Sequence, residues 1–259
     1  MQVLMRPWGH MNFVDEGPKD APAILFLNSL GTDMRMWQEV TRSLPYRCIR
    51  ADKRGHGLSA TPAKDWTVED AADDAVALLD HLGIGVATIA GCSVGGMIAQ
   101  AFGIHHPKRA VALILSNTAA KIGTPESWQA RIDTIGRDGI ASIADVILDR
   151  WFPPAFRASE AALPWRTMLL RADPQGYIQT CRALSQADLR AGLASLRLPV
   201  LLIAGSQDQS TPPALVTETA ALIHGAQLVE LAGSGHIPAI DAPEATARAI
   251  MSFQEALHA

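Results

Sequence analysis

The chain has 259 residues, of which 48% are hydrophobic and 19% charged, and its formal net charge at pH 7 is −4. Apolar segments spread through both halves of a chain this long favour one large α/β domain over two small ones. The mildly acidic balance argues against nucleic acid or an anionic membrane as a partner, because neither is attracted to a negatively charged surface.

The start of the chain carries no targeting signal. Residues 1–7 lack the charged start and long apolar run of a secretory signal, and no apolar run approaches the length of about 18 residues that a membrane span needs. The three cysteines have neither metal-site nor disulfide spacing, so we expect a cytoplasmic protein without a metal. Two apolar runs, 3–4 and 11–14, predict an antiparallel hairpin at a sheet edge.

The next segments alternate between strand-like and helix-like patterns. The expected strands are 23–28 and 48–52, and the expected helices are about 34–44 and 68–82. The second helix has a clear start signal, with Thr67 as its N-cap and Asp70 at the third helical position. This alternation is typical of a mostly parallel sheet with helices on both faces.

A G-x-S-x-G sequence follows the apolar run 87–90 and precedes a helical pattern that extends to about residue 106. At such a strand-to-helix turn a serine is held in a strained conformation with its hydroxyl exposed, which makes Ser93 a candidate nucleophile. Gly91 and Gly95 are needed because a Cβ at either position would collide with the neighbouring strand or helix.

The alternation breaks after an expected strand at 112–116. The residues that follow have helical periodicity, several prolines and three tryptophans, but no apolar strand until Val200. We therefore expect 119–195 to form a helical lid inserted into a core made of 1–118 and 196–259. Its tryptophans either anchor the lid or line a pocket, and the pattern favours neither role.

A serine nucleophile needs a base and an acid that orients it. The apolar strand 200–205 is followed by Asp208, and the strand pattern 227–231 is followed by His236. Loops at strand ends carry the chemistry of α/β folds. The chain order of Ser93, Asp208 and His236 is the order of the α/β-hydrolase triad.

Three other acidic residues compete with Asp208 for the role of the acid. Asp173 and Asp188 lie outside any strand-end context, and Asp241 is better interpreted as the N-cap of a final helix at about 243–257. Asp208 is therefore the favoured acid.

Acyl transfer also needs two donors directed at the developing alkoxide. One would be the backbone N–H of Val94, directly after the nucleophile. The other would be the backbone N–H of Leu30, in the loop that follows the strand 23–28.

Four segments together carry a resemblance to a known family. They are Asn28-Ser29-Leu30-Gly31-Thr32-Asp33, Asp52-Lys53-Arg54-Gly55-His56-Gly57, the Gly91 to Gly96 turn, and Ser116-Asn117-Thr118-Ala119-Ala120-Lys121-Ile122-Gly123-Thr124. With Arg150-Trp151-Phe152, they resemble 3-oxoadipate enol-lactonase of the α/β-hydrolase superfamily. The turn and the R-G-H-G sequence are common in the superfamily, whereas the segment ending at Thr124 points to this family.

The resemblance implies an α/β-hydrolase fold with an inserted helical lid. It also implies a serine hydrolase that opens 3-oxoadipate enol-lactone to 3-oxoadipate through an acyl-enzyme, without cofactor or metal. The reaction belongs to the catabolism of aromatic compounds by way of protocatechuate or catechol. The substrate would be a small lactone that bears a carboxylate.

A carboxylate in an apolar pocket needs a cation or several N–H donors. Arg131 is the first candidate because it lies one helical turn after Trp128 and can share its face, and Lys121 is the second. Trp128 and Trp151 are the expected aromatic residues of the pocket.

Other functions remain open. A carboxylesterase, a perhydrolase or a carbon-carbon bond hydrolase would use the same triad, and the lid sequence favours the lactonase among them. Ser93 disfavours an aspartate-nucleophile dehalogenase. A ligand-binding module that has kept a hydrolase core is a different class, which turnover of a generic ester would exclude. The sequence does not indicate the oligomeric state.

Overall fold

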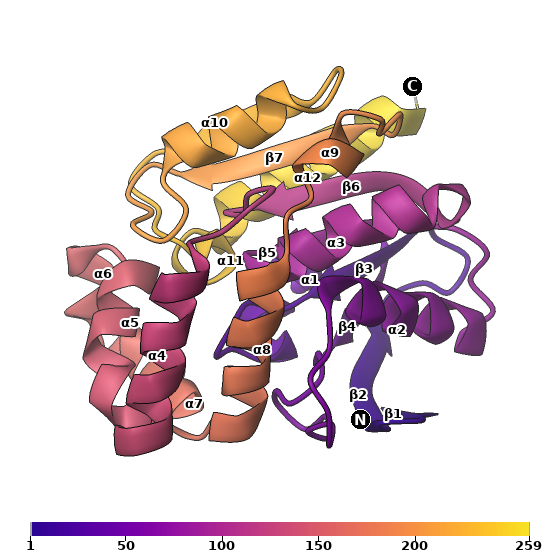
Figure 1. The fold of residues 1–259 in the computed structure, drawn as a ribbon. Helices are drawn as coiled ribbons and strands as arrows, with labels where there is room; N and C mark the ends of the chain where they lie inside the picture. The colour runs from indigo at the N-terminus through magenta and orange to yellow at the C-terminus, as the bar shows by residue number, and fades with distance from the viewer. Residues whose placement is uncertain (1, 259) are drawn as a thin grey trace.

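Eight strands form one sheet in residues 2–258, the part of the chain that the computed structural model describes (Figure 1). Across the sheet the order is β1-β2-β4-β3-β5-β6-β7-β8. The strands are β1 (Gln2–Arg6), β2 (Gly9–Glu16), β3 (Ala23–Leu27), β4 (Arg47–Ala51), β5 (Ala87–Cys92), β6 (Ala110–Ser116), β7 (Val200–Gly205) and β8 (Gln227–Leu231). β2 pairs antiparallel with both β1 and β4, and every other pair is parallel. The expected edge hairpin and mostly parallel sheet are confirmed.

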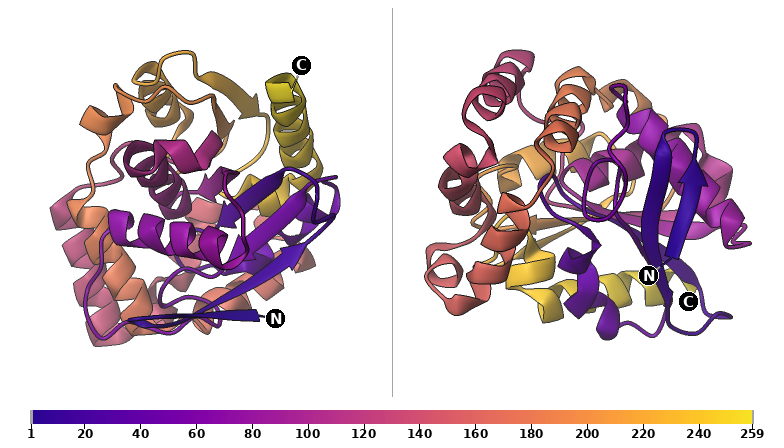
Figure 2. Two further views of the ribbon diagram at one scale, coloured as in Figure 1. Left: turned by 90° about the vertical axis from the view of Figure 1, so that its right-hand side faces the viewer. Right: turned by 90° about the horizontal axis from the view of Figure 1, so that it is seen from below.

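Helices cover both faces of the sheet (Figure 2). α2 (Val68–His81) and α3 (Val94–His105) pack together on one face, and α1 (Gln38–Arg42) packs with α12 (Pro243–His258) on the other. α10 (Pro213–Ala221) packs on β7 and β8. Every residue of β5 and β7 is buried, as expected for apolar strands covered on both faces. In residues 2–258 no helix combines the length and the apolar character that a bilayer crossing requires.

The two early helices differ in how well they match the sequence expectation. The capping box at α2 is confirmed, since Thr67 and Asp70 each bond the other's backbone N–H. The helix expected at about 34–44 is shorter and divided. A 3-10 turn, η1 (Met34–Trp37), is capped by Asp33, and α1 follows it and ends at Arg42.

The segment between β6 and β7 is helical. Apart from the 3-10 turn η2 (Pro107–Arg109) before β6, the remaining elements up to β7 are α4 (Pro125–Asp138), η3 (Ile140–Ile143), α5 (Ala144–Trp151), α6 (Pro154–Arg157), η4 (Glu160–Ala162), α7 (Leu163–Leu170), α8 (Pro174–Gln186) and α9 (Arg190–Leu193). We call α4 to α9 the insertion. α4 packs along α8, and Figure 1 shows α4 to α8 gathered at one end of the sheet. The backbones of Gly176 in α8 and Gly55 in the core touch so closely that neither position has room for a Cβ.

Asp241 does not cap the final helix, so that expectation was wrong. It ends the short helix α11 (Pro238–Asp241), and α12 begins at Pro243. The Asp241 carboxylate accepts hydrogen bonds from the Ser234 hydroxyl and from the Gly235 N–H at 2.7 Å. These two donors direct the carboxylate toward the loop after β8. They lie outside the helix pattern that suggested a cap.

Candidate active site

Ser93 lies at the turn between β5 and α3 with φ 56° and ψ −120°. Such a conformation costs a non-glycine residue roughly 1–3 kcal/mol, so its surroundings must hold it in place. The Ser93 N–H donates to the carbonyl of Ser116 on the neighbouring strand at 3.0 Å. A Cβ on Gly91 would overlap the carbonyl of Gly95, and one on Gly95 would overlap the carbonyl of Leu27. The turn therefore has the geometry of a nucleophile elbow.

Asp208 follows β7, and its buried carboxylate is surrounded by donors. Oδ1 accepts from the backbone N–H groups of Ser210 (2.7 Å) and Thr211 (3.0 Å). Oδ2 accepts from the Thr211 hydroxyl (2.7 Å), the Asn117 amide (2.9 Å) and Nδ1 of His236 (2.9 Å). Burial alone would raise the pKa of Asp208, but the charge of His236 and these side-chain hydrogen bonds hold it below its ordinary value. The carboxylate is therefore ionised at neutral pH.

His236 follows β8 and is 2% exposed. Because its Nδ1 donates to Asp208, Nε2 is left as the proton acceptor on the other side of the ring. The backbone N–H of His236 donates to the carbonyl of Trp151 at 2.8 Å, which ties this loop to the insertion. Among the described residues no hydrogen bond joins the imidazole to the Ser93 hydroxyl. In free enzymes this contact is often long, and it shortens when substrate binds.

The two expected oxyanion donors lie next to this group. Val94 is the first residue of α3 and follows Ser93 directly, and Leu30 lines the same pocket as Ser93. Beside Leu30, Gly31 has a φ of 76° and donates its N–H to Nε2 of His56 at 3.1 Å. This hydrogen bond fixes the loop after β3 against the loop after β4.

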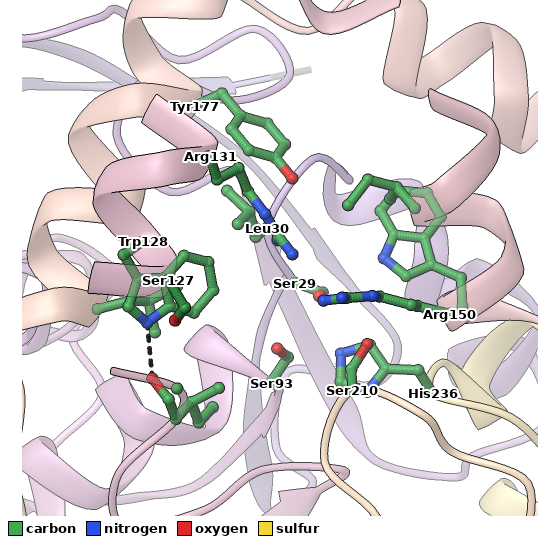
Figure 3. Close-up of a pocket in the computed structure, with 15 residues that line it drawn as sticks. Ser29, Leu30, Ser93, Ser127, Trp128, Arg131, Arg150, Tyr177, Ser210 and His236 are labelled. Atoms are coloured by element: carbon green, nitrogen blue, oxygen red, sulfur yellow. Dashed lines mark hydrogen bonds between the residues drawn. The ribbon is translucent and has the colours of Figure 1, made fainter. Parts of the chain in front are cut away.

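A pocket of about 170 Å³ opens in front of Ser93 and His236 (Figure 3). Pockets for drug-sized ligands are usually about 300–1,000 Å³, so this one suits a small substrate. Ser29 contributes a buried hydroxyl that has no hydrogen-bond partner among residues 2–258. The larger side chains that the insertion contributes are Trp128, Arg131, Ile147, Arg150, Trp151, Tyr177 and Leu184.

Arg131 and Arg150 bring two cations into this pocket. Figure 3 shows both guanidinium groups pointing into the space above Ser93. Other arginines of the insertion, such as Arg157 and Arg166, pair with aspartates, whereas neither pocket arginine has a carboxylate within 4.0 Å in the described part of the chain. Burial, and next the charge of Arg131, lowers the pKa of Arg150. The pocket thus holds positive charge that a bound anion would neutralise.

The two predicted tryptophans both line the pocket and both hold the insertion in place. The indole N–H of Trp128 donates to the carbonyl of Ile122 at 2.7 Å, and the guanidinium of Arg131 lies 4.9 Å from its ring centre. Trp151 packs edge-on against Phe152, with 6.0 Å between the ring centres, and its indole lies against Gly31 of the core. Both tryptophans therefore have both of the roles that the sequence left open.

Lys121 lies outside the pocket, against our expectation. Its ammonium is 3.3 Å from the carboxylate of Asp188, and its side chain is 41% exposed. After β6 the chain turns toward α9, where the Leu189 N–H donates to the carbonyl of Ala120 at 2.9 Å. This contact directs Lys121 toward Asp188 instead of toward Ser93.

Four residues of the site were not among the candidates that we identified from the sequence. Asn117 directly follows an expected strand, which is the signal that pointed to Asp208, and it donates to both Asp208 and the carbonyl of Gly235. Arg150 lies in a segment that carried the family resemblance. Ser29 also lies in such a segment, directly before Leu30. Tyr177 gave no signal, because only packing of the insertion against the core brings it into the pocket.

Comparisons with known proteins can now be set beside this geometry. Residues 24–249 match the Alpha/beta hydrolase family. The 3-oxoadipate enol-lactonase 2 of Acinetobacter baylyi is 37% identical over 247 residues, which cover 93% of this chain and 91% of the relative. The solved enol-lactonase of Burkholderia xenovorans has a TM-score of 0.94 at 33% identity and covers 98% of this chain and 100% of its own. A thermophilic esterase from Thermogutta terrifontis has a TM-score of 0.93 at 27% identity, with 100% of both chains covered.

The chain belongs to the alpha/beta hydrolase family, and it is a hydrolase. Its mostly parallel sheet, its turn at Ser93 and its helical insertion fit that family. Within it, the chain is a homologue of the 3-oxoadipate enol-lactonases, which confirms the resemblance and the fold expected from the sequence. No three His, Cys, Asp or Glu side chains in residues 2–258 are arranged to hold a metal ion.

Proposed function

We propose that this hydrolase opens the ring of 3-oxoadipate enol-lactone and releases 3-oxoadipate. One observation carries the proposal: the guanidinium groups of Arg131 and Arg150, neither of which pairs with a carboxylate in the described residues, share a small pocket with Ser93 and His236. A carboxylate that leaves water needs charged donors, and this lactone bears a carboxymethyl group on its ring. The name of the Acinetobacter baylyi relative gives the same substrate.

In the first half of the reaction, Ser93 Oγ attacks the ring carbonyl while Nε2 of His236 takes the hydroxyl proton. Asp208, which accepts from Nδ1, stabilises the imidazolium that forms. The N–H groups of Leu30 and Val94 bind the negative oxygen of the tetrahedral intermediate. Its collapse breaks the ring C–O bond, and the enolate that leaves takes the proton held by His236 and becomes a ketone. Formation of this ketone makes ring opening strongly favourable.

In the second half, the acyl-enzyme is hydrolysed. The leaving group stays tethered to the acyl group, so the whole molecule remains bound through Ser93. His236 now takes a proton from water, and the hydroxide attacks the ester carbonyl. Collapse of the second tetrahedral intermediate returns the proton to Ser93 Oγ and releases 3-oxoadipate.

The arginines act before and during this chemistry. Arg131 and Arg150 bind the carboxymethyl group and place the lactone carbonyl against Ser93, so they contribute to substrate choice and orientation. Support comes from their shared position on the insertion side of the pocket. It also comes from the lowered pKa of Arg150, which a bound anion would raise.

We also propose that the enzyme works in the cytoplasm. Support comes from Cys48, Cys92 and Cys181, which are all buried and free. Proteins of oxidising compartments use cysteines for disulfides far more often.

A general carboxylesterase is the second candidate, because the Thermogutta terrifontis esterase matches this chain over its full length. Turnover of 3-oxoadipate enol-lactone, followed by its ultraviolet absorbance, should exceed turnover of p-nitrophenyl acetate in kcat/KM by at least about tenfold. The carbonyl chemistry is shared, so binding of the carboxylate must supply the difference. Preference for the uncharged ester would favour the esterase, and no turnover of either would favour a binding module.

A further inference from the structure

Lys53 is a buried lysine behind the active site. β3 and β4 are parallel neighbours whose last paired residues are Leu27 and Ala51, so the segments two residues further on meet at the carboxyl edge of the sheet. There Nζ of Lys53 donates to the backbone carbonyl of Ser29 at 2.6 Å. Lys53 is 4% exposed, and this is the one hydrogen bond of its ammonium among the described residues.

The carbonyl that Lys53 binds and the N–H of Leu30 belong to the same peptide group, the one that joins Ser29 to Leu30. Three more donors reach the same oxygen: the Thr32 hydroxyl at 3.0 Å, the Asn28 amide at 3.2 Å and the Thr32 N–H at 3.4 Å. Four donors on one carbonyl fix the plane of the peptide. Hydrogen bonds on a carbonyl oxygen also draw electron density from the peptide, which makes its N–H a stronger donor.

This position of Lys53 is costly for the fold. Among residues 2–258 no carboxylate lies within 4.0 Å of its ammonium, and burial lowers its pKa well below the ordinary value, with the charges of Asp52, Asp33 and Cys92 opposing that effect. A buried cation without an ion-pair partner usually destabilises a protein, and an apolar residue of similar volume would cost less. A structural role alone therefore does not explain the lysine.

We propose that protonated Lys53 positions and polarises the Ser29–Leu30 peptide so that the Leu30 N–H stabilises the oxyanion more strongly. Lys53 is a positioning residue that acts through the backbone and does not touch the substrate. The inference rests on the proposed function of Leu30 as an oxyanion donor. It adds a buried charge to a hole otherwise built from neutral N–H groups.

The test compares Lys53→Met with Thr32→Val, which removes a neutral donor to the same carbonyl. Loss of a whole oxyanion donor costs about 10²–10³ in kcat, so weakening one by removal of the charge should cost at least about tenfold. We expect Lys53→Met to lower kcat that much on both p-nitrophenyl acetate and the enol-lactone, with KM for the lactone within twofold. Thr32→Val should lose less than about threefold. Equal losses in the two variants would overturn the role of the charge.

The pH dependence of kcat gives a second test, and its first part needs only the native enzyme. The titratable groups around the ammonium are Asp52, Asp33, Cys92 and His56. As the pH rises above 7, kcat on the ester should fall as Lys53 loses its proton, at a lower pH than an ordinary lysine would, and this fall should be absent in Lys53→Met. A flat native profile, or a fall that the variant keeps, would overturn the inference. The variant Ser93→Ala distinguishes a failure of the inference from a failure of the proposed function. An active Ser93→Ala would contradict the proposed function itself. An inactive Ser93→Ala together with a fully active Lys53→Met would contradict only the inference about Lys53.

Discussion

The two sides of the pocket are built differently. On the core side, Ser93, Asp208 and His236 are 7%, 4% and 2% exposed, and each is held at the end of a strand by hydrogen bonds to the backbone or to side chains. On the insertion side, Arg131 and Arg150 are long side chains on helices. Arg131 is half-buried and Arg150 is exposed, and neither has a carboxylate partner in the described residues. The difference supports the proposed function and suggests the hypothesis of a division of labour, in which the core performs the acyl transfer and the insertion selects a substrate that bears a carboxylate.

The largest expected effect is the loss of the nucleophile. Ser93→Ala should lower kcat at least about a thousandfold on the enol-lactone and on p-nitrophenyl acetate alike, because no acyl-enzyme can form on either. Steady-state kinetics measure the loss, and thermal unfolding should show a folded variant. A loss confined to one substrate would break the division between the two sides.

The second effect tests whether Asp208 is the acid that orients His236. Asp208→Asn should lower kcat by about 10³, since the amide no longer holds the imidazole with Nδ1 protonated. Asp188→Asn is the matched control, because Asp188 pairs with Lys121 and Arg190 away from the pocket. We expect the control to stay within about twofold of the native rate. A larger loss in Asp188→Asn than in Asp208→Asn would contradict the assignment of Asp208 as the acid that orients His236.

The third effect concerns the insertion. Arg131→Met and Arg150→Met should each raise KM for the enol-lactone by about 10-fold to 100-fold, the range for loss of a hydrogen bond to a charged group. Arg166→Met is the control on the same insertion, since Arg166 pairs with Asp145 outside the pocket. Unchanged KM values in both pocket variants would remove these arginines from substrate binding.

The smallest effect is on stability. Burial raises the pKa of Asp241 from 3.8 to about 6. The folded state therefore holds this proton more tightly, and the stability it contributes below pH 3.8 is lost as the pH rises through about 6. Between pH 5 and 8 the native protein should lose about 1.4 kcal/mol through this group, one pKa unit's worth. Urea unfolding of Asp241→Asn should lack that loss, and an identical pH dependence in both proteins would contradict it.

The sequence predicted well what depends on local pattern. The strands, the capping box of α2 and the positions of Ser93, Asp208 and His236 at strand ends all follow from short apolar runs and their neighbours. Asp241 was misjudged because its partners, Ser234 and Gly235, lie outside the helix pattern that suggested a cap.

The pocket side formed by the insertion was less predictable. Helical periodicity shows that a side chain lies on an apolar or polar face, but the packing of the helices decides which faces meet the core. Arg131 shares a face with Trp128 and was found, whereas Arg150 lies on another helix and was not. Lys121 was the second candidate after Arg131 for the cation that binds a substrate carboxylate, yet the contact between Ala120 and Leu189 directs it toward Asp188.

The division of labour is tested most directly by the selectivity of the double variant Arg131→Met with Arg150→Met. The quantity to measure is kcat/KM for 3-oxoadipate enol-lactone divided by kcat/KM for p-nitrophenyl acetate. We predict that this ratio falls at least about a hundredfold while kcat/KM for the uncharged ester stays within about threefold of the native value. An unchanged ratio, or equal losses on both substrates, would contradict the claim that the insertion selects the substrate and the core transforms it.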